Sequence, residues 1–142
     1  MKYWILVTHP NNFGVMKAKN MAAMKAKRKS FALQVEPGDK VAFYLTKIGK
    51  FGGVATFKSK VKEDKSKIFT EEKLGETHPW RFDIEFEAKL DEADYVPSEN
   101  FKDKLVYLKK WPAKYWKLGF QGNVHEIGKD DFETLKQGLD KK

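Results

Sequence analysis

The sequence has no cysteine and only three histidines among its 142 residues. Without cysteine the chain cannot form disulfides, thiolate nucleophiles or zinc sites built on Cys ligands. His9, His78 and His125 stand far apart, and none has another histidine or a carboxylate at the spacing of metal ligands on a helix. We therefore expect no metal and no other cofactor.

Signature motifs of enzymes are also missing. The chain has no Gly-x-Ser-x-Gly turn, and its Gly-Lys-Phe-Gly-Gly run at 49–53 lacks the Gly-Lys-Ser/Thr ending of a phosphate loop. The carboxylates of residues 83–92 alternate along an expected strand, which is typical of a solvated face. We therefore expect a protein that is not an enzyme.

Long hydrophobic runs are absent as well. The longest, Tyr3 to Val7, is far shorter than the ~18 apolar residues that a membrane helix needs. No small-residue cleavage site of a signal peptide follows it. The expected localisation is cytoplasmic, with no membrane partner.

Aromatic side chains, by contrast, are abundant. Eleven Phe, five Tyr and four Trp contribute to a hydrophobic content of 41%. A chain of this length can bury roughly two thirds of its unfolded surface in one core. No linker, internal repeat or low-complexity tract interrupts it, so residues 1–142 are expected to form a single domain.

Charge is unevenly distributed along the chain, which has 28 Lys+Arg against 20 Asp+Glu. No acid precedes Glu36, although seven basic residues do. A second basic block, 102–117, has six lysines against Asp103 and is interleaved with Tyr107, Trp111, Tyr115 and Trp116. Acids gather in 83–99 and 126–133, so one face is expected to be positive and to bind a polyanion. The alternative is a lysine-rich surface that serves only solubility, because lysine greatly outnumbers the arginine that favours phosphate.

Hydrophobic patterns predict the order of the elements. Strands are expected at 3–8, 40–47, 54–62, 80–90 and 124–127, and helices at 13–20 and 129–139. The strand at 80–90 alternates, with Phe82 and Ile84 on a core face and Arg81 and Asp83 on a water face. The two strands on either side of a turn at 49–53 form a hairpin, residues 25–30 form an exposed basic loop, and 63–79 form a charged connection. The expected fold class is α+β, a small, mostly antiparallel barrel of five to six strands with helices near both ends.

Short motifs in a characteristic order run through nearly the whole chain: Tyr3-Trp4-Ile5-Leu6-Val7-Thr8, Asn11-Asn12, Pro37-Gly38-Asp39, Phe51-Gly52-Gly53-Val54, His78-Pro79-Trp80-Arg81-Phe82, Trp116, Phe120-x-Gly122, Glu126-Ile127 and Asp131-Phe132. In these motifs the sequence resembles the EVE domain family. The resemblance implies a PUA-like barrel, related to the YTH readers of methylated adenine. It also implies binding to nucleic acid, RNA or modified DNA, through a single-stranded or flipped base, including a modified one, in an aromatic-walled pocket.

Carried over by position, the resemblance assigns a base-binding pocket and a set of residues for the phosphate backbone. The pocket residues are Thr8, His9, Asn11, Asn12, Met21, Ala22, Phe69, His78 and Trp80. The backbone residues are Lys17, Lys25, Lys27, Arg28, Lys29, Lys109, Lys110, Lys117, Phe120 and Gln121. Related sequences commonly have a Trp where this chain has Ala22, so a softer or larger pocket, or a loss of base reading, is expected there.

Several alternatives remain open at this level. Asn12 either contacts the base edge or serves as the N-cap of the helix expected at 13–20. Trp80 and Trp116 are either pocket walls or core residues. A different function, an amidohydrolase of the ASCH type on the same barrel, requires Lys25 or Lys47 with a partner in the pocket. The aromatic residues of 107–120 could instead form a protein interface, so a monomer or a weak homodimer is expected.

Overall fold

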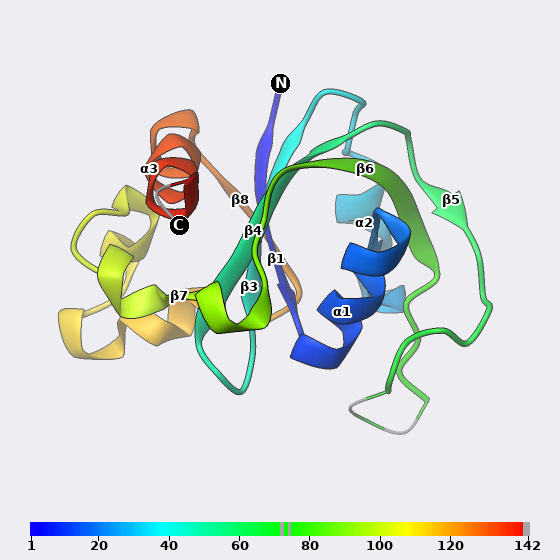
Figure 1. Cartoon of the computed structure of the whole chain (residues 1–142), viewed down its shortest axis with the longest axis horizontal. Helices are drawn as coiled ribbons and strands as arrows, with labels where there is room; N and C mark the ends of the chain where they lie inside the picture. The colour runs from blue at the N-terminus through cyan, green and yellow to red at the C-terminus, as the bar shows by residue number, and fades with distance from the viewer. Residues whose placement is uncertain (72, 74, 141–142) are drawn as a thin grey trace.

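The computed structural model describes residues 1–71, 73 and 75–140. Its centre is a curled sheet with the strand order β2-β6-β4-β3-β1-β8 (Figure 1). These strands are β1 (Tyr3–Thr8), β2 (Met21–Met24), β3 (Lys40–Leu45), β4 (Lys50–Phe57), β6 (Trp80–Lys89) and β8 (Val124–Ile127). Neighbours pair antiparallel, except β1 and β3, which are parallel. The predicted α+β class is confirmed, as a mixed, mostly antiparallel half-barrel.

Short strands and helices complete the fold. Strands β5 (Lys62–Glu63) and β7 (Val96–Pro97) pair with β6 and β4. Helices α1 (Pro10–Lys19) and α2 (Lys29–Ala32) lie on the side around which β6 curls, and α3 (Lys129–Asp140) lies on the other (Figure 1). The 3₁₀ helices are Ala26–Arg28, Glu92–Asp94, Ser98–Phe101, Val106–Lys110 and Ala113–Phe120. In the part of the chain that is described, no helix has the length and apolar character to cross a bilayer.

Each face of the sheet has its own core, and β1 contributes to both. Trp4 and Leu6 pack in the cluster that contains Phe13 of α1, whereas Ile5 packs in the cluster that contains Phe132 of α3. A strand that is buried on both faces has apolar residues at successive positions rather than alternating ones. The continuous apolar run at the start of the sequence therefore follows from the helices on both sides of the sheet.

The turn at 36–39, before β3, is held by the buried carboxylate of Asp39. It accepts hydrogen bonds from the backbone N–H of Lys2 (3.0 Å) and of Glu36 (3.0 Å) and from the indole N–H of Trp4 (3.2 Å). Gly38 has φ +99°, a conformation that glycine adopts without strain. The turn thereby joins the N-terminus, β1 and the start of β3.

The first helix begins earlier than predicted. It starts at Pro10, a residue that suits the first helical position, and its N-cap is His9, whose Nδ1 accepts the backbone N–H of Asn11 at 3.0 Å. The prediction of a start at Phe13 with Asn12 as N-cap is wrong, because histidine supplies the capping acceptor. Asn12 consequently lies within α1, and its side chain is available for another contact.

Two further predictions need correction. Residues 25–30 form a 3₁₀ helix and the start of α2 rather than a loop. The hairpin of β3 and β4 is confirmed, but the turn ends at Gly49, and the other two glycines predicted for it, Gly52 and Gly53, lie in β4. Gly52 belongs in that strand because a Cβ there would collide with the ring of Phe13.

The alternation predicted for 80–90 is confirmed over residues 82–85 of β6. Phe82 and Ile84 are buried, and Asp83 and Glu85 are exposed. Arg81, predicted to face water, is only 4% exposed. The connection between β5 and β6 covers its side chain.

Candidate nucleic-acid interface

The connection between β5 and β6 is anchored to α1 by Asn12. The side-chain amide of this buried residue donates from Nδ2 to the backbone oxygen of Thr70 (3.0 Å), and its Oδ1 accepts the backbone N–H of Thr70 (2.7 Å). Both polar atoms are therefore used within the protein. The amide that the resemblance assigns to a base edge is occupied by the backbone of the chain itself.

Arg81 anchors the same connection from β6. Its Nε donates to the backbone oxygen of His78 (3.0 Å), and its terminal nitrogens donate to the hydroxyl (2.7 Å) and the backbone oxygen of Ser66. Asp64 forms an ion pair with Nη1 at 3.4 Å, and the ring of Phe69 lies 5.2 Å from the guanidinium carbon. A buried guanidinium is stable only when its donors are satisfied in this way.

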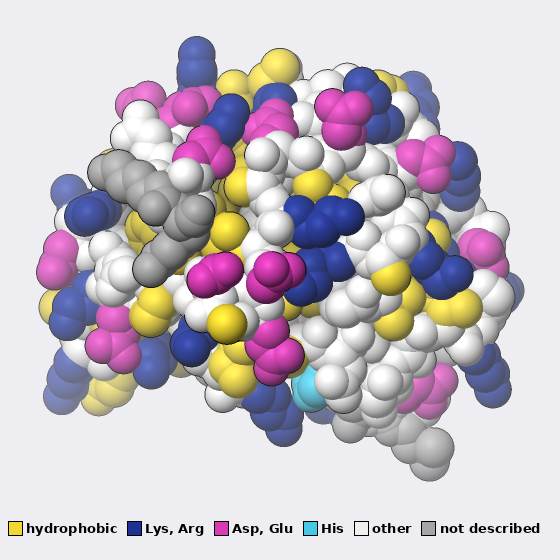
Figure 2. Space-filling model, viewed as in Figure 1, with side chains coloured by type: hydrophobic (Ala, Val, Ile, Leu, Met, Phe, Trp, Pro, Cys, Tyr) yellow, Lys and Arg dark blue, Asp and Glu magenta, His cyan; other side chains and the backbone are white. Residues whose placement is uncertain are grey.

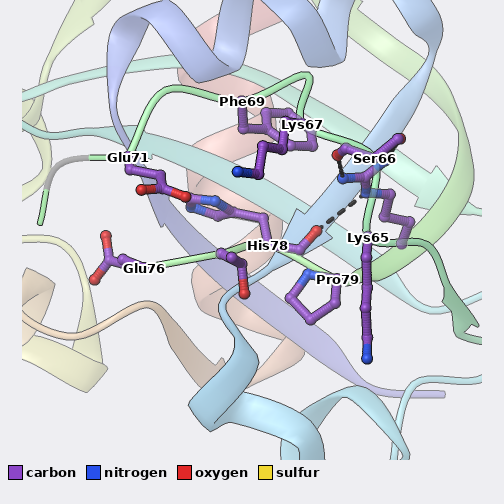
Figure 3. Close-up of a pocket in the computed structure, with 10 residues that line it drawn as sticks. Lys65, Ser66, Lys67, Phe69, Glu71, Glu76, His78 and Pro79 are labelled. Atoms are coloured by element: carbon purple, nitrogen blue, oxygen red, sulfur yellow. Dashed lines mark hydrogen bonds between the residues drawn. The ribbon is translucent and has the colours of Figure 1, made fainter. Parts of the chain in front are cut away.

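Phe69 and His78 line a small cavity under this connection (Figure 3). Their ring centres are 5.4 Å apart, and Figure 3 shows the carboxylate of Glu71 directed toward the His78 ring. The cavity volume is about 20 Å³. A water molecule needs roughly 10–15 Å³ by this measure, so the space fits about one water and not a base.

The other residues assigned to the base pocket are spread over the ends of several elements. Thr8 and Ala22 are buried, and Ala22 pairs with Phe82 in the core between β2 and β6. Trp80 is half-buried, and its indole N–H donates to the backbone oxygen of Ala26 at 2.9 Å. Asn11 is exposed, and His9 and Met21 are half-buried. Asn12, Phe69 and His78 thus meet at one connection, while Thr8 and Ala22 do not reach an open surface.

A larger groove opens beside that connection, where the end of β1 meets residues 25–27 and the loop 120–123. Its volume is about 290 Å³, close to the lower end of the roughly 300–1,000 Å³ that is typical of small-molecule sites. The polar residues that line it include Lys25, Lys27, Lys73, Gln121 and Asn123. An adjoining hollow of about 280 Å³ shares the three lysines. Lys73 and Asn123 were not predicted from the sequence.

Asn123 fixes the floor of this groove. Its buried Oδ1 accepts the backbone N–H of Lys25 at 2.9 Å, and its Nδ2 donates to the backbone oxygen of Val7 at 2.8 Å. One amide therefore ties the segment after β2 to β1. The backbone around the groove is held in place before any ligand binds.

Lys25 and Glu76 form an ion pair at the edge of the groove, with Nζ and Oε2 3.3 Å apart. Both side chains are mostly buried. Glu76 is a partner that the sequence did not reveal, because it lies in a connection without a periodic pattern. Among residues 1–71, 73 and 75–140, no three histidines or carboxylates group as a metal site.

The lysines assigned to phosphates do not all face solvent. Lys17 is half-buried, and its ammonium group donates to the backbone oxygen of Leu90 (3.1 Å) and to the hydroxyl of Tyr95 (2.6 Å). Lys25 and Arg28 are half-buried, and the exposed ones are Lys27, Lys29, Lys109, Lys110 and Lys117. Exposed Gln121 lines the groove.

Phe120 is a core residue that reaches the groove. It is 4% exposed and stacks on Tyr44 with ring centres 4.4 Å apart. Trp116 is half-buried, and its ring centre is 6.2 Å from that of Phe120. Trp111 and Trp116 also line a separate groove of about 340 Å³ with Lys102 and Lys109. The basic and aromatic block of 102–117 thus has a hollow surface of its own.

Tyr107 supports the loop that carries Phe120. Its hydroxyl donates to the backbone oxygen of Gly119 at 3.0 Å, and burial raises the pKa of Tyr107 to about 12. The ring therefore remains neutral at physiological pH. Its contacts hold the 3₁₀ helices of residues 106–120 together.

Charges of both signs are interspersed on one side of the molecule (Figure 2). Dark blue and magenta side chains alternate over the face shown, with hydrophobic atoms between them. The face in this view therefore does not have the single sign expected of a positive surface.

Comparison with known proteins gives one family over nearly the whole chain. The model of the EVE domain family matches residues 2–137. The UPF0310 protein of Pyrococcus abyssi is 28% identical in an alignment that covers 98% of this chain and 100% of the relative.

Solved structures of similar shape include YTH domains. The YTH domain of Pho92 in complex with m6A has a TM-score of 0.70 at 12% identity, covering 97% of this chain and 85% of that one. The YTH domain of Zygosaccharomyces rouxii MRB1 in complex with N6-methyladenosine RNA has a TM-score of 0.65 at 15% identity, covering 97% and 86%. At these identities the likeness shows a shared fold.

Proposed function

This chain belongs to the EVE domain family, and we propose that it is a non-enzymatic nucleic-acid-binding module. The ligand is RNA or DNA with an unpaired or flipped base. The base enters the groove between residues 25–27 and the loop 120–123. YTH domains of the same fold, from Pho92 and MRB1, have been solved with m6A and with N6-methyladenosine RNA, which supports a ligand of this class.

The observation that carries this proposal is a preformed groove edged by cations. Its volume of about 290 Å³ suits one base, and Lys25, Lys27 and Lys73 line it. A base outside its helix must regain the lost stacking, worth roughly 1–3 kcal/mol, from apolar contact. The aliphatic stems of the lysines and the edge of Phe120 offer that contact, while the exposed ammonium groups of Lys27 and Lys73 attract the flanking phosphates.

Recognition of the base edge is assigned to Gln121. Its amide is exposed in the groove and carries both donors and an acceptor. Asn12 is left out of this role because Thr70 occupies its amide. Ala22 is also left out, since it is buried in the core.

Preference for a methylated base is expected to be small in this groove. Burial of one methyl group contributes about 0.8 kcal/mol, which is less than one order of magnitude in affinity. A strong preference requires an aromatic cage, and Ala22 stands where relatives commonly have its Trp.

The test is a titration of short single strands of RNA and of DNA, unmodified and methylated, at low and high salt. Lys27→Gln removes an exposed groove cation, and Lys58→Gln removes an exposed cation that does not line the groove. The proposal expects salt-sensitive binding that Lys27→Gln weakens more than Lys58→Gln does. No binding by the wild type at low salt would refute it.

One observation favours a second candidate, the ASCH-type amidohydrolase. That alternative requires a lysine with a partner in the pocket, and Lys25 lies 3.3 Å from Glu76 in the groove. Incubation of the protein with acylated nucleosides, followed by chromatography, separates the two candidates. Turnover that Glu76→Gln abolishes would favour the enzyme, and unchanged substrate would favour binding alone.

A further inference from the structure

Arg28 and His125 lie close to Gly122, which lines the groove beside Gln121. Gly122 has φ +85°, and a Cβ there would lie 3.2 Å from Nη2 of Arg28 and 3.7 Å from Cε1 of His125. Lys110 and His125 share a third neighbour, because the Lys110 ammonium lies 5.0 Å and the His125 ring 5.7 Å from the ring of Tyr107. The absence of a side chain at Gly122 leaves room beside Arg28 and His125.

Arg28 has donor capacity that the protein does not use. Of the two arginines, Arg81 is committed to Ser66 and His78, whereas Nε of Arg28 is buried and has no hydrogen-bond partner. Within the described ranges, no carboxylate forms an ion pair with either Arg28 or Lys110. A planar guanidinium is the side chain best matched to phosphate oxygens.

We propose that Arg28, Lys110 and His125 form a phosphate site, and that protonation of His125 strengthens it. The ligand is a phosphate group of the nucleic acid, either a diester within the strand or a terminal monoester. Gln121 and Gly122 line the groove, so the phosphate lies next to the base held there. This inference rests on the proposed function and adds to it the position of one phosphate and a dependence on pH.

The charges that act on His125 are those of Arg28 and Lys110, and Lys110 also lines a hollow with Glu126, Asp130 and Asp131. Burial lowers the pKa of His125, the hydrogen-bond contact with the Gln121 backbone oxygen opposes this, and the charges of Arg28 and Lys110 lower it further. Tyr107, which also faces the ring, remains neutral. Glu126 follows His125 in β8, where successive side chains point to opposite faces of the sheet.

A phosphate reverses this balance. An anion among the three groups favours the charged imidazolium, so binding raises the pKa of His125 and takes up a proton. By linkage, affinity rises as the pH falls through the pKa of His125 in the complex, and it levels off below the pKa of His125 in the free protein. A rise of one pKa unit on binding corresponds to about a tenfold gain in affinity between high and low pH.

The experiment is an NMR titration of the histidine ring signals of the wild type. The probes are inorganic phosphate, a short single strand without a terminal phosphate, and the same strand with a 5′-phosphate. The expected result is a rise in the pKa of His125 on binding. A rise in the pKa of His125 with both strands supports a diester. A rise with inorganic phosphate and the 5′-phosphorylated strand, but not with the strand that lacks a terminal phosphate, supports a monoester.

Substitutions give an independent readout. Arg28→Gln and Lys110→Gln are expected to weaken strand binding by about tenfold each, more than the control Lys58→Gln. Both are also expected to flatten the pH dependence. Arg28→Lys keeps the charge but loses the planar fork, so it is expected to recover binding only in part.

The outcomes separate this inference from the proposed function. If strands bind with the expected salt dependence while the His125 signals do not respond to any probe, the phosphate site is refuted and the proposed function stands. If no strand binds at low salt, the proposed function fails and the phosphate site fails with it.

Discussion

The side-chain amide of Asn12 is paired on both sides with the backbone of Thr70, through hydrogen bonds of 3.0 and 2.7 Å. This pairing fastens the long connection between β5 and β6 to α1. The connection also carries Glu76 and Lys73, which line the groove. Asn12 therefore influences the groove indirectly, because it fixes the connection that carries Lys73 and Glu76.

Replacement of Asn12 should destabilise the protein. Asn12→Ala leaves the N–H and the oxygen of Thr70 without partners, and we expect it to lower the free energy of unfolding by about 2 kcal/mol. Urea denaturation measures this. Asn12→Asp keeps an acceptor for the Thr70 N–H but sets a carboxylate against its oxygen, so it should also destabilise. Wild-type stability in both variants would contradict this role.

Two helical glycines are predicted to respond in opposite ways to alanine. Gly14 in α1 has open space around it, and Gly14→Ala should raise stability by about 0.5–1 kcal/mol through helix propensity. A Cβ at Gly138 in α3 would lie 2.5 Å from the buried ring of Phe101, so Gly138→Ala should lower stability. Thermal unfolding of the pair provides the comparison, and a rise in melting temperature for Gly138→Ala would show that α3 packs differently.

The folded protein should lose stability at mildly acidic pH because of His125. Its pKa in the folded protein is lowered from 6.5, first by burial, so the unfolded chain takes up the proton at a higher pH than the folded one. Stability should therefore fall as the pH drops below about 6.5 and level off below the pKa of the folded state. Denaturant midpoints between pH 8 and pH 5 give the profile. His125→Gln should remove this part of the slope, and an unchanged slope would assign it to other groups.

Gly122 is predicted to be sensitive to any side chain. Gly122→Ala must hold φ near +85° and places a Cβ 3.2 Å from Arg28, so it should both destabilise the loop and displace the guanidinium. We expect weaker binding of single strands than in the wild type. Gly38→Ala is a matched control, since φ there is also positive but no atom lies within 4 Å of the new Cβ. Equal losses of binding in the two variants would mean that only backbone strain matters.

Much of the fold could be predicted from local patterns. The apolar run of β1, the alternation of β6 and the amphipathic α3 each carry their own signal, because burial on one or both faces fixes the residue types. Two local features differ from the prediction. His9 caps α1 in place of Asn12, and Gly52 and Gly53 lie in a strand because the ring of Phe13 and the backbone oxygen of Ala88 leave no space for a Cβ there.

The groove could not be predicted in the same way. Lys25 and Glu76 meet only because the β5–β6 connection folds back over the segment after β2. The parallel pairing of β1 with β3 likewise has no signature in the local sequence. Arg81 shows the same limit, since its position in the alternation indicates water while the connection buries it. The charge distribution along the sequence predicts a polyanion as the ligand. Which lysines line the same groove depends on the tertiary structure, and the sequence does not reveal it.

The most direct measurement is a map of the backbone amides that respond to a short single-stranded RNA at low salt. If the groove holds the base, the largest NMR shifts fall on the amides of Lys25, Lys27, Gln121, Gly122 and Asn123. The binding constant obtained from these shifts falls as the salt concentration rises, with a log–log slope of about −0.7 per phosphate contacted. Shifts confined to the Trp111–Trp116 groove, or no shifts at all, would contradict the claim that this EVE domain binds nucleic acid through the groove beside Lys25.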